Sequence, residues 1–289
     1  MNASSTRTAF VFAGGGSLGA VQVGMLHALA ERDLRPDFVV GASAGAINAA
    51  FFAADPTPSG VAALDRLWCG LTRRQIMPMR VRDLFRIATR RAYVVDPSAL
   101  RRLLERHLPY RLLEHATIPM HVVATDMVLG VERLLSTGSV VDAVMASTAI
   151  PGLFPPVRIG DHDLIDGGVA NNTPISSALA LGATRVVVLP TGFACALRSI
   201  PKSAVGRALH ALSLLVTRQL VNDIERFGGS VALHVVPPLC PVDSSPYDYS
   251  ASATLINRAR DTTREWIRGG GLDQPHGVPH QMTEHSHAH

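Results

Sequence analysis

The sequence predicts an α/β fold, a three-layer α/β/α arrangement around a central, mostly parallel sheet. Short β-rich runs alternate with helical patterns along most of the 289 residues, and this alternation is typical of parallel sheets. Hydrophobic residues make up 47% of the chain and charged residues 17%, which indicates a globular protein with a substantial core. Gly, Pro or charged residues interrupt each apolar run before the roughly 18 residues that suggest a membrane span.

The expected strands are apolar runs bracketed by helical patterns, at residues 10–12, 38–40, 121–123, 185–189 and 233–236. Residues 157–165 predict a β-hairpin that turns at Gly160-Asp161-His162. Residues 205–227 predict a core-packing helix, because apolar side chains recur there at helical spacing. These side chains are Leu209, Leu212, Val216, Leu220, Ile224 and Phe227.

We expect one domain, with the principal motifs in residues 8–175 and with residues 176–268 completing it. Residues 269–289 lose all periodicity and predict a disordered, His-rich tail. The N-terminus, Met1 to Arg7, lacks the pattern of a secretory signal, so we expect a cytoplasmic protein while leaderless export stays open. Three scattered cysteines have no metal-type spacing. The formal net charge is +4. Its sign makes anionic surfaces plausible partners, but the excess is mild, and we expect no nucleic-acid ligand.

A glycine-rich loop follows the first expected strand. Gly14, Gly16 and Gly19 fit the pattern G-x-G-x-x-G before a helix, and such a loop collects backbone N–H groups around a position that favours negative charge. The anion is either a nucleotide phosphate or an oxyanion formed during catalysis. A dinucleotide site needs an acidic residue at the carboxyl end of the next strand, whereas Asp37 precedes that strand.

The second expected strand runs into Gly41-Ala42-Ser43-Ala44-Gly45, which matches G-x-S-x-G. On such a strand-to-helix elbow the serine hydroxyl projects clear of the backbone, although a tight helix start explains the same pattern. Two adjacent parallel strands place their following loops side by side. The glycine loop can therefore receive the oxyanion of an intermediate formed by Ser43.

The base that would activate Ser43 is better sought among the aspartates than among the histidines. His234 lies inside an apolar strand and most other late histidines belong to the tail. Asp166 ends a short apolar strand before Gly167-Gly168, and Asp126 is a second candidate of the same type. An Asx turn is the structural alternative for Asp166. Because an ordinary aspartate has a pKa near 3.9, catalysis by it requires a partly dehydrated site.

Three motifs in fixed order, "GGGSLG", "GASAG" and "DGG", together resemble the patatin-like phospholipase family. The stretches "ATDM" and "ASTAIPGLFPPV" are similar to that family as well. The resemblance covers residues 8–174 well and the chain up to residue 268 weakly. It implies a patatin-like α/β fold and a Ser–Asp dyad in place of a triad.

Carried over residue by residue, the resemblance implies Ser43 as nucleophile and Asp166 as its base. It further implies no cofactor and no metal. The oxyanion donors would come from the loop at Gly14, Gly15 and Gly16, chiefly the last two, with help from the Ala44 amide. The remaining motif glycines are Gly19, Gly41, Gly45, Gly167 and Gly168. One departure is Leu18, where many members carry Arg or Lys, and this puts headgroup contacts in doubt more than the chemistry.

The expected activity is hydrolysis of a fatty-acyl ester of a phospholipid or lysophospholipid through an acyl-enzyme. A neutral-lipid lipase or a general carboxylesterase would use the same residues. A nucleotide- or lipid-binding protein without catalysis is the alternative of another class. Leu71 to Tyr93 mixes arginines with apolar residues, and either a basic amphipathic insertion on an anionic bilayer or a solvated helix explains that pattern.

Overall fold

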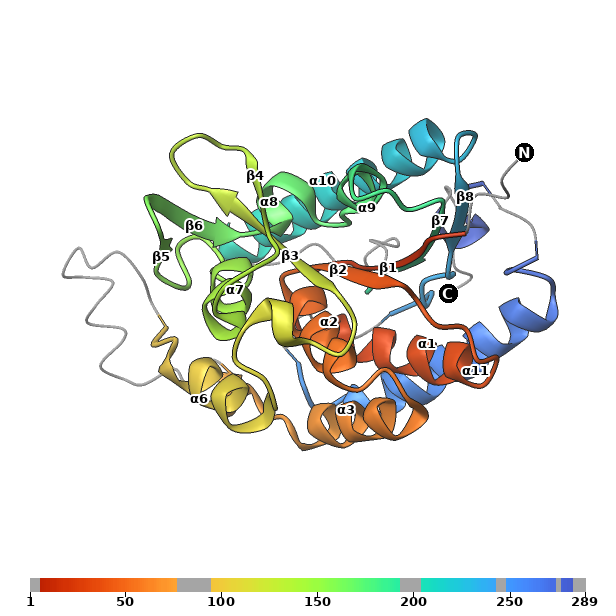
Figure 1. Cartoon of the computed structure of the whole chain (residues 1–289), viewed down its shortest axis with the longest axis horizontal. Helices are drawn as coiled ribbons and strands as arrows, with labels where there is room; N and C mark the ends of the chain where they lie inside the picture. The colour runs from red at the N-terminus through yellow and green to blue at the C-terminus, as the bar shows by residue number, and fades with distance from the viewer. Residues whose placement is uncertain (1–5, 77–94, 193–203, 243–247, 274–276, 283–289) are drawn as a thin grey trace.

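The computed structural model describes residues 6–76, 95–192, 204–242, 248–273 and 277–282, and its core is an eight-stranded sheet (Figure 1). The strand order is β5-β6-β3-β2-β1-β7-β8, and β4 also pairs with β3. Strands β3, β2, β1, β7 and β8 run parallel, whereas β4 and β6 run antiparallel to β3. The strands are β1 (Thr8–Phe12), β2 (Phe38–Ala42), β3 (Met120–Asp126), β4 (Glu132–Leu135), β5 (Val157–Ile159), β6 (His162–Asp166), β7 (Arg185–Leu189) and β8 (Ala232–Val235).

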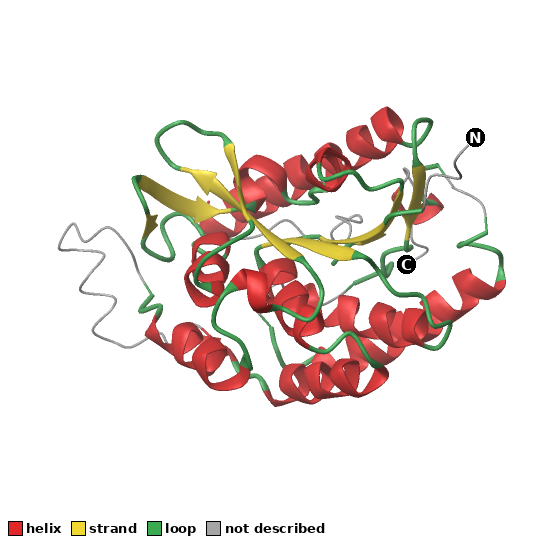
Figure 2. Cartoon of the chain, viewed as in Figure 1, coloured by secondary structure: helices red, strands yellow, loops and turns green. Residues whose placement is uncertain are grey.

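Helices cover both faces of the sheet, which confirms the three-layer prediction (Figure 2). Strand residues alternate between the two faces: Phe10 and Phe12 belong to one apolar cluster, and Ala9 and Val11 belong to the other. Packed into the first cluster are α1 (Ala20–Ala30), α2 (Ala44–Ala54), α3 (Pro58–Gly70), α6 (Ser98–His107), α7 (Val140–Ser147) and α11 (Ser252–Arg268). The second cluster contains α9 (Ile175–Ala180) and the C-terminal part of α10 (Ala204–Phe227).

Short elements complete the described chain. They are α4 (Arg73–Ile76), α8 (Gly168–Asn171) and the 3₁₀ turns η1 (Gly16–Gly19), η2 (Leu113–His115) and η3 (His280–Met282). No helix among the described residues combines the length and the apolar character that crossing a membrane requires.

The register of β3 brings the ends of β2 and β6 together. Ala42, the last residue of β2, lies opposite Val123. Asp166, the last residue of β6, lies opposite the next residue of β3, Ala124. Because these two partners are consecutive, the residue after β2 and the residue that ends β6 emerge beside each other.

The predicted strands and the hairpin are confirmed. β1, β2 and β3 extend beyond the predicted residues, and β8 begins and ends one residue earlier than predicted. His162 begins β6 rather than belonging to the turn, and β4 was not expected. The long helix is present, and its core-packing interpretation is confirmed at Leu220 and Ile224, which are buried. The burial of Leu209 and Leu212 lies outside what the structure describes, and Leu214 and Leu215, which were not predicted to pack in the core, are exposed.

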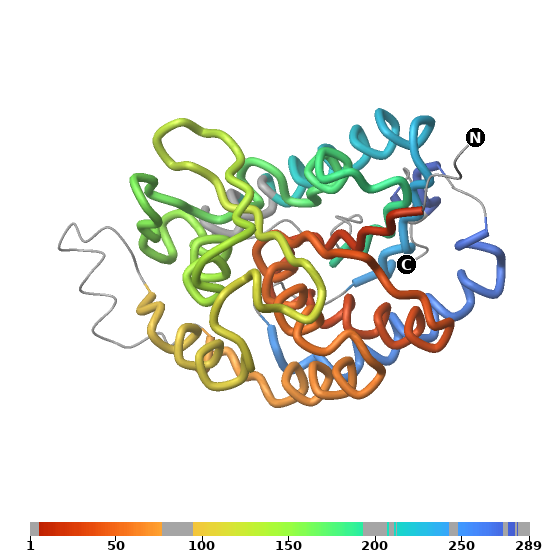
Figure 3. Tube along the Cα trace, in the orientation of Figure 1, coloured from red at the N-terminus to blue at the C-terminus, as the bar shows by residue number. Residues whose placement is uncertain are grey.

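The segment expected to be a disordered tail is described in part. Residues 270–273 and 277–282 belong to the structure, where Met282 is buried and Val278 packs against the second cluster. Residues 283–289 lie outside the described residues, so disorder there stays a prediction, as does the division of the chain at residues 175 and 268. Figure 3 traces the chain through these segments.

Candidate active site

Ser43 occupies the sharp turn between β2 and α2. Its backbone has φ 52° and ψ −125°, a left-handed conformation that costs about 1–3 kcal/mol in a residue with a Cβ and is found mainly at functional sites. The turn holds the hydroxyl just beyond the strand end, with only 9% of the residue exposed. Its Oγ donates a hydrogen bond of 2.7 Å to Oδ2 of Asp166. The predicted pair is therefore assembled.

Asp166 is 6% exposed and is fixed at the end of β6 by its own backbone. Its N–H donates to the Ala149 carbonyl at 3.0 Å, and its carbonyl accepts from the Thr125 hydroxyl at 2.8 Å. Its second carboxylate oxygen accepts the Gly168 N–H at 2.8 Å. One oxygen thus faces Ser43 while the other closes the turn, so the Asx-turn interpretation and the pairing with Ser43 hold together.

Burial raises the pKa of Asp166 from its ordinary value to about 6, and the hydrogen bonds from Ser43 and Gly168 oppose that shift. Burial has this effect because a dehydrated site disfavours the charged carboxylate. A carboxylate with a pKa near 6 is a stronger base than an exposed aspartate and is still mostly ionised at pH 7. The dehydrated environment that the sequence argument required is present.

The glycine loop lies against Ser43, but its three glycines differ in their hydrogen bonding. The Gly14 N–H donates to the Asn172 carbonyl at 3.0 Å, and the Gly14 carbonyl accepts from the Thr191 hydroxyl at 2.7 Å. Gly14 was expected among the oxyanion donors, and this is corrected because its amide is already used. The amides of Gly15 and Gly16 have no hydrogen-bond acceptor among the described residues. The Ala44 amide belongs to the first turn of α2, where amides lack an intrahelical acceptor.

The other motif glycines permit close approaches between segments. A Cβ on Gly45 would collide with the Phe12 carbonyl, and one on Gly167 would collide with the Val123 carbonyl. A Cβ added to Gly41 would meet the Gly45 backbone. One added to Gly19 would meet the ring of Trp68, and one added to Gly168 would meet the side chain of Asn172. The strand ends and turns of the site therefore pack against each other with no room for side chains.

A buried polar network on α1 and α2 supports the glycine loop. Gln22 on α1 donates to the carbonyls of Ala13 and Leu189, both at 2.8 Å. Asn48 on α2 donates to the Gly19 carbonyl at 2.9 Å and to Gln22 at 2.7 Å. The sequence analysis missed both residues, although a polar residue inside an otherwise apolar helix is a usable signal. Because buried polar groups need such partners, the network ties the glycine loop to α2.

Ser147, at the end of α7, is a further residue that the sequence analysis did not single out. Its hydroxyl accepts the Ser43 N–H at 2.8 Å and donates to the Val123 carbonyl at 2.6 Å. Ser147 itself is fully buried. It therefore bridges the elbow to β3 and holds Ser43 in its left-handed conformation.

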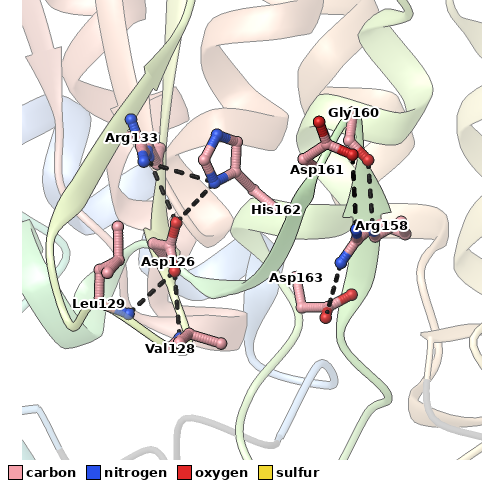
Figure 4. Close-up of polar contacts among 9 residues, drawn as sticks. All are labelled: Asp126, Val128, Leu129, Arg133, Arg158, Gly160, Asp161, His162 and Asp163. Carbon is pink, nitrogen blue, oxygen red and sulfur yellow. Dashed lines mark hydrogen bonds and ion pairs between the residues drawn. The ribbon is translucent and has the colours of Figure 1, made fainter.

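Asp126, the second aspartate considered as a base, has a different environment. Its carboxylate accepts the Val128 and Leu129 amides at 3.1 and 3.0 Å, and His162 and Arg133 face its other oxygen (Figure 4). These contacts lower its pKa, the Leu129 amide most of all. With its oxygens engaged in this way, Asp126 shapes the β3–β4 turn, and the structure does not bring it to Ser43.

The remaining candidates lie elsewhere. Asp37 accepts the Thr8 N–H at 2.6 Å, at the amino end of the parallel strands and thus at the opposite end from the glycine loop. His234, on β8, places Nδ1 3.1 Å from the Gly271 carbonyl. Of the arginine-rich segment Leu71 to Tyr93, residues 77–93 lie outside the described residues, so its membrane interpretation stays a prediction.

A pocket of about 360 Å³ adjoins the segment that follows α7. Met145, Thr148, Ala149 and Phe154 contribute to its wall. Ser43 and Asp166 do not line it. Ala149, one of its lining residues, is also the residue whose carbonyl accepts the Asp166 N–H.

Comparison with known proteins agrees with the motifs. The model of the patatin-like phospholipase family matches residues 10–179. The chain is 28% identical over 186 residues to patatin-like phospholipase domain-containing protein 7 of Rattus norvegicus, with 64% of this chain and 13% of that protein covered. It is 36% identical over 167 residues to an uncharacterized NTE family protein of Mycobacterium tuberculosis, with 57% and 27% covered. The chain thus spans a minor part of these relatives' length.

Among solved structures, the crystal structure of VipD from Legionella pneumophila aligns with a TM-score of 0.48 at 16% sequence identity. The alignment covers 91% of this chain and 67% of that chain.

Proposed function

Since this chain belongs to the patatin-like phospholipase family, we propose that it is a lipid acyl hydrolase that cleaves fatty-acyl esters of phospholipids or lysophospholipids. The observation that carries the proposal is the 2.7 Å hydrogen bond from the Ser43 hydroxyl to a buried carboxylate of Asp166. A nucleophile within hydrogen-bond reach of a base is the geometry that serine ester hydrolysis needs.

In the proposed mechanism Ser43 Oγ attacks the ester carbonyl carbon while Asp166 Oδ2 takes the hydroxyl proton. The amides of Gly15, Gly16 and Ala44 stabilise the resulting oxyanion. The tetrahedral intermediate expels the alcohol, which receives the proton from Asp166. Water then attacks the acyl-Ser43 ester and gives its proton to Asp166, and the fatty acid leaves as Ser43 regains its hydrogen.

Labelling with a fluorophosphonate ester tests the nucleophile, and fatty-acid release from phospholipid vesicles tests the activity. Ser43→Ala should abolish both, and Asp166→Asn should abolish the release. Asp126→Asn, measured by labelling and on a soluble ester, is the matched control, because it neutralises a buried aspartate that does not contact Ser43. Labelling that persists in Ser43→Ala, or fatty-acid release that survives it, would contradict the proposal.

A substrate panel separates the related activities, because triglycerides and short-chain esters contain the same bond. We expect phospholipid or lysophospholipid to be hydrolysed with a higher kcat/KM than triglyceride. Calorimetry with NAD and NADP addresses the nucleotide-binding alternative, for which Asp37 lies at the wrong end of the sheet. Heat of binding at a 1:1 ratio would support that alternative.

A further inference from the structure

The exposed large apolar side chains of the described residues are concentrated on three elements. Every such side chain that is at least 46% exposed lies in the β3–β4 turn, on α8 or on α10. They are Met127, Val128, Leu129, Val131, Val169, Leu214 and Leu215, and we call these seven the apolar rim. Scattered apolar residues are normal on a protein surface, whereas their concentration marks an interaction site.

Hydrogen bonds hold the three elements together. On α8, the Ala170 N–H donates to the Thr125 hydroxyl on β3 at 3.1 Å. Asn171 on the same helix donates to Glu132 on β4 at 2.8 Å. The Gln219 side chain on α10, one helical turn after Leu215, donates to the Ala170 carbonyl at 3.2 Å. The elements that carry the rim are therefore joined to one another.

The β3–β4 turn is held in a defined shape despite its exposed side chains. Asp126, only 2% exposed, accepts the amides of Val128 and Leu129, and its other oxygen lies 2.8 Å from Nδ1 of His162 (Figure 4). Val128 is 81% exposed and Leu129 is 61% exposed. A buried carboxylate that fixes a turn while that turn presents apolar side chains to solvent indicates a surface prepared for a partner.

The rim lies at the end of the sheet that carries the Ser–Asp pair. The β3–β4 turn leaves the carboxyl end of β3, beside the end of β2 that leads to Ser43 (Figures 1 and 3). Val169 follows Asp166 by three residues, on the helix that the Asp166 turn begins. A partner that covers the rim is therefore brought to the same edge as Ser43.

Charge decides which partner fits. Residues 127–131 contain no charged side chain. The hairpin's charged residues are matched: Arg133 lies 3.4 Å from Asp126, and Glu132 accepts hydrogen bonds from Asn171 and Ser177. The β3–β4 part of the rim therefore complements a lipid layer without net charge better than an anionic one, while the exposed Arg218 lies on the α10 part, one turn after Leu214. We propose that the apolar rim docks the protein on a zwitterionic phospholipid surface, an inference that rests on the proposed function.

The test measures binding to phosphatidylcholine vesicles in the Ser43→Ala background, so that no lipid is consumed. The double variant Val128→Asp with Leu129→Asp should lower the partition coefficient at least tenfold. The matched control, Val128→Ile with Leu129→Met, keeps the side chains apolar and should bind like its parent. Because apolar contact is not screened by salt, we expect 0.5 M NaCl to change the partitioning by less than about threefold. Equal binding of all three proteins, or binding abolished by salt, would overturn the inference.

A reporter at the rim gives an independent readout. In Leu129→Trp, vesicles should shift the indole emission to the blue, and brominated phosphatidylcholine should quench it. The control is Ala253→Trp, which places a tryptophan at an exposed position on α11 and should show neither change. No shift at residue 129, or equal quenching at both positions, would also overturn the inference.

Two further measurements separate the possible failures. Hydrolysis of a short soluble ester, measured with Ser43 present, should be unchanged by the double Asp variant. If wild type hydrolyses this ester but its vesicle binding does not depend on the rim, the inference fails and the proposed function stands. If no ester is hydrolysed while binding depends on the rim, the proposed function fails instead. A dimer in lipid-free buffer that the double Asp variant dissociates would assign the rim to a second copy and overturn lipid docking.

Discussion

Asp166 and Asp126 lie at the ends of two paired strands, and both are less than a tenth exposed, yet their pKa values shift in opposite directions. Asp166 accepts one hydroxyl and one amide, and burial raises its pKa to about 6. Asp126 accepts two amides and faces His162 and Arg133, and these contacts lower its pKa. The comparison teaches that the balance between dehydration and hydrogen bonding decides the direction: dehydration is the larger effect at Asp166, and the hydrogen bonds outweigh it at Asp126.

The largest expected difference between the two aspartates is in catalysis. Asp166→Asn should lower kcat/KM on a soluble ester by at least about 10³-fold, because the hydroxyl of Ser43 loses its base. Asp126→Asn should change it by less than about tenfold, since that carboxylate shapes a turn and does not contact Ser43. Steady-state kinetics on both purified variants makes the comparison. Comparable losses in the two variants would contradict the assignment of the base.

The pH profile is the next largest effect. Because Asp166 acts as a base only when ionised, kcat/KM should rise with pH and level off above the Asp166 pKa of about 6. Below that value it should fall about tenfold per pH unit. Asp126→Asn should leave this midpoint in place. A midpoint near 4, the ordinary value for aspartate, would mean that the site is not dehydrated in solution.

A smaller effect is expected at the residue that positions the elbow. Ser147→Ala removes the acceptor of the Ser43 N–H and should lower kcat by about tenfold, which corresponds to about 1.4 kcal/mol. KM should change little, and the Asp166 pH midpoint should stay near its wild-type value. Ser147→Thr keeps the hydroxyl and should recover part of the rate. If kcat is unchanged in Ser147→Ala, the elbow does not need this bridge.

Replacing each aspartate by asparagine should change the stability of the folded state in opposite directions at pH 8. The folded pKa of Asp166 is raised, so the folded state is penalised as the pH rises from about 4 through about 6 and remains penalised above that. Asp166→Asn should therefore raise the free energy of unfolding at pH 8 by about 1–3 kcal/mol, and the gain should disappear by pH 4.

Asp126 should show the reverse, because its folded pKa is lowered. Its contribution to stability is present above the ordinary aspartate pKa and is lost as the pH falls through the lower folded value. Asp126→Asn should therefore lower Tm at pH 8, and the difference from wild type should shrink in acid. Thermal unfolding at pH 4 and pH 8 checks both variants. The same direction of change in the two variants would contradict the contrast.

Much of the fold was accessible from the sequence because buried parallel strands leave apolar runs between helical patterns. Ser43 and Asp166 were accessible because each adjoins glycines that a strand-end turn requires. The residues by themselves did not separate Asp166 from Asp126, since both follow an apolar run and precede a turn; only the family resemblance assigned the base to Asp166. The difference in their hydrogen bonding depends on contacts across the fold. Asp166 meets Ser43, 123 residues away, and Asp126 meets His162, 36 residues away, as well as Arg133.

The remaining residues of the site depend on tertiary contacts. The Gly14 amide is used by Asn172, which lies 158 residues away, and no local pattern shows that. Ser147 has an ordinary helical context, so only its contacts with Ser43 and Val123 reveal its position. The strand β4 escaped prediction because its four residues, Glu-Arg-Leu-Leu, are all only partly buried and show no alternation of apolar and polar side chains.

The consecutive pairing of Val123 with Ala42 and of Ala124 with Asp166 has a consequence for sequence drift. A single residue inserted between Leu164 and Asp166 would reverse the direction in which the carboxylate points, because side chains alternate along a strand. An insertion at Gly160-Asp161, in the exposed turn, would leave both pairings in place. Lineages that retain hydrolysis should therefore gain and lose residues at the tip of this hairpin while the length of β6 stays constant.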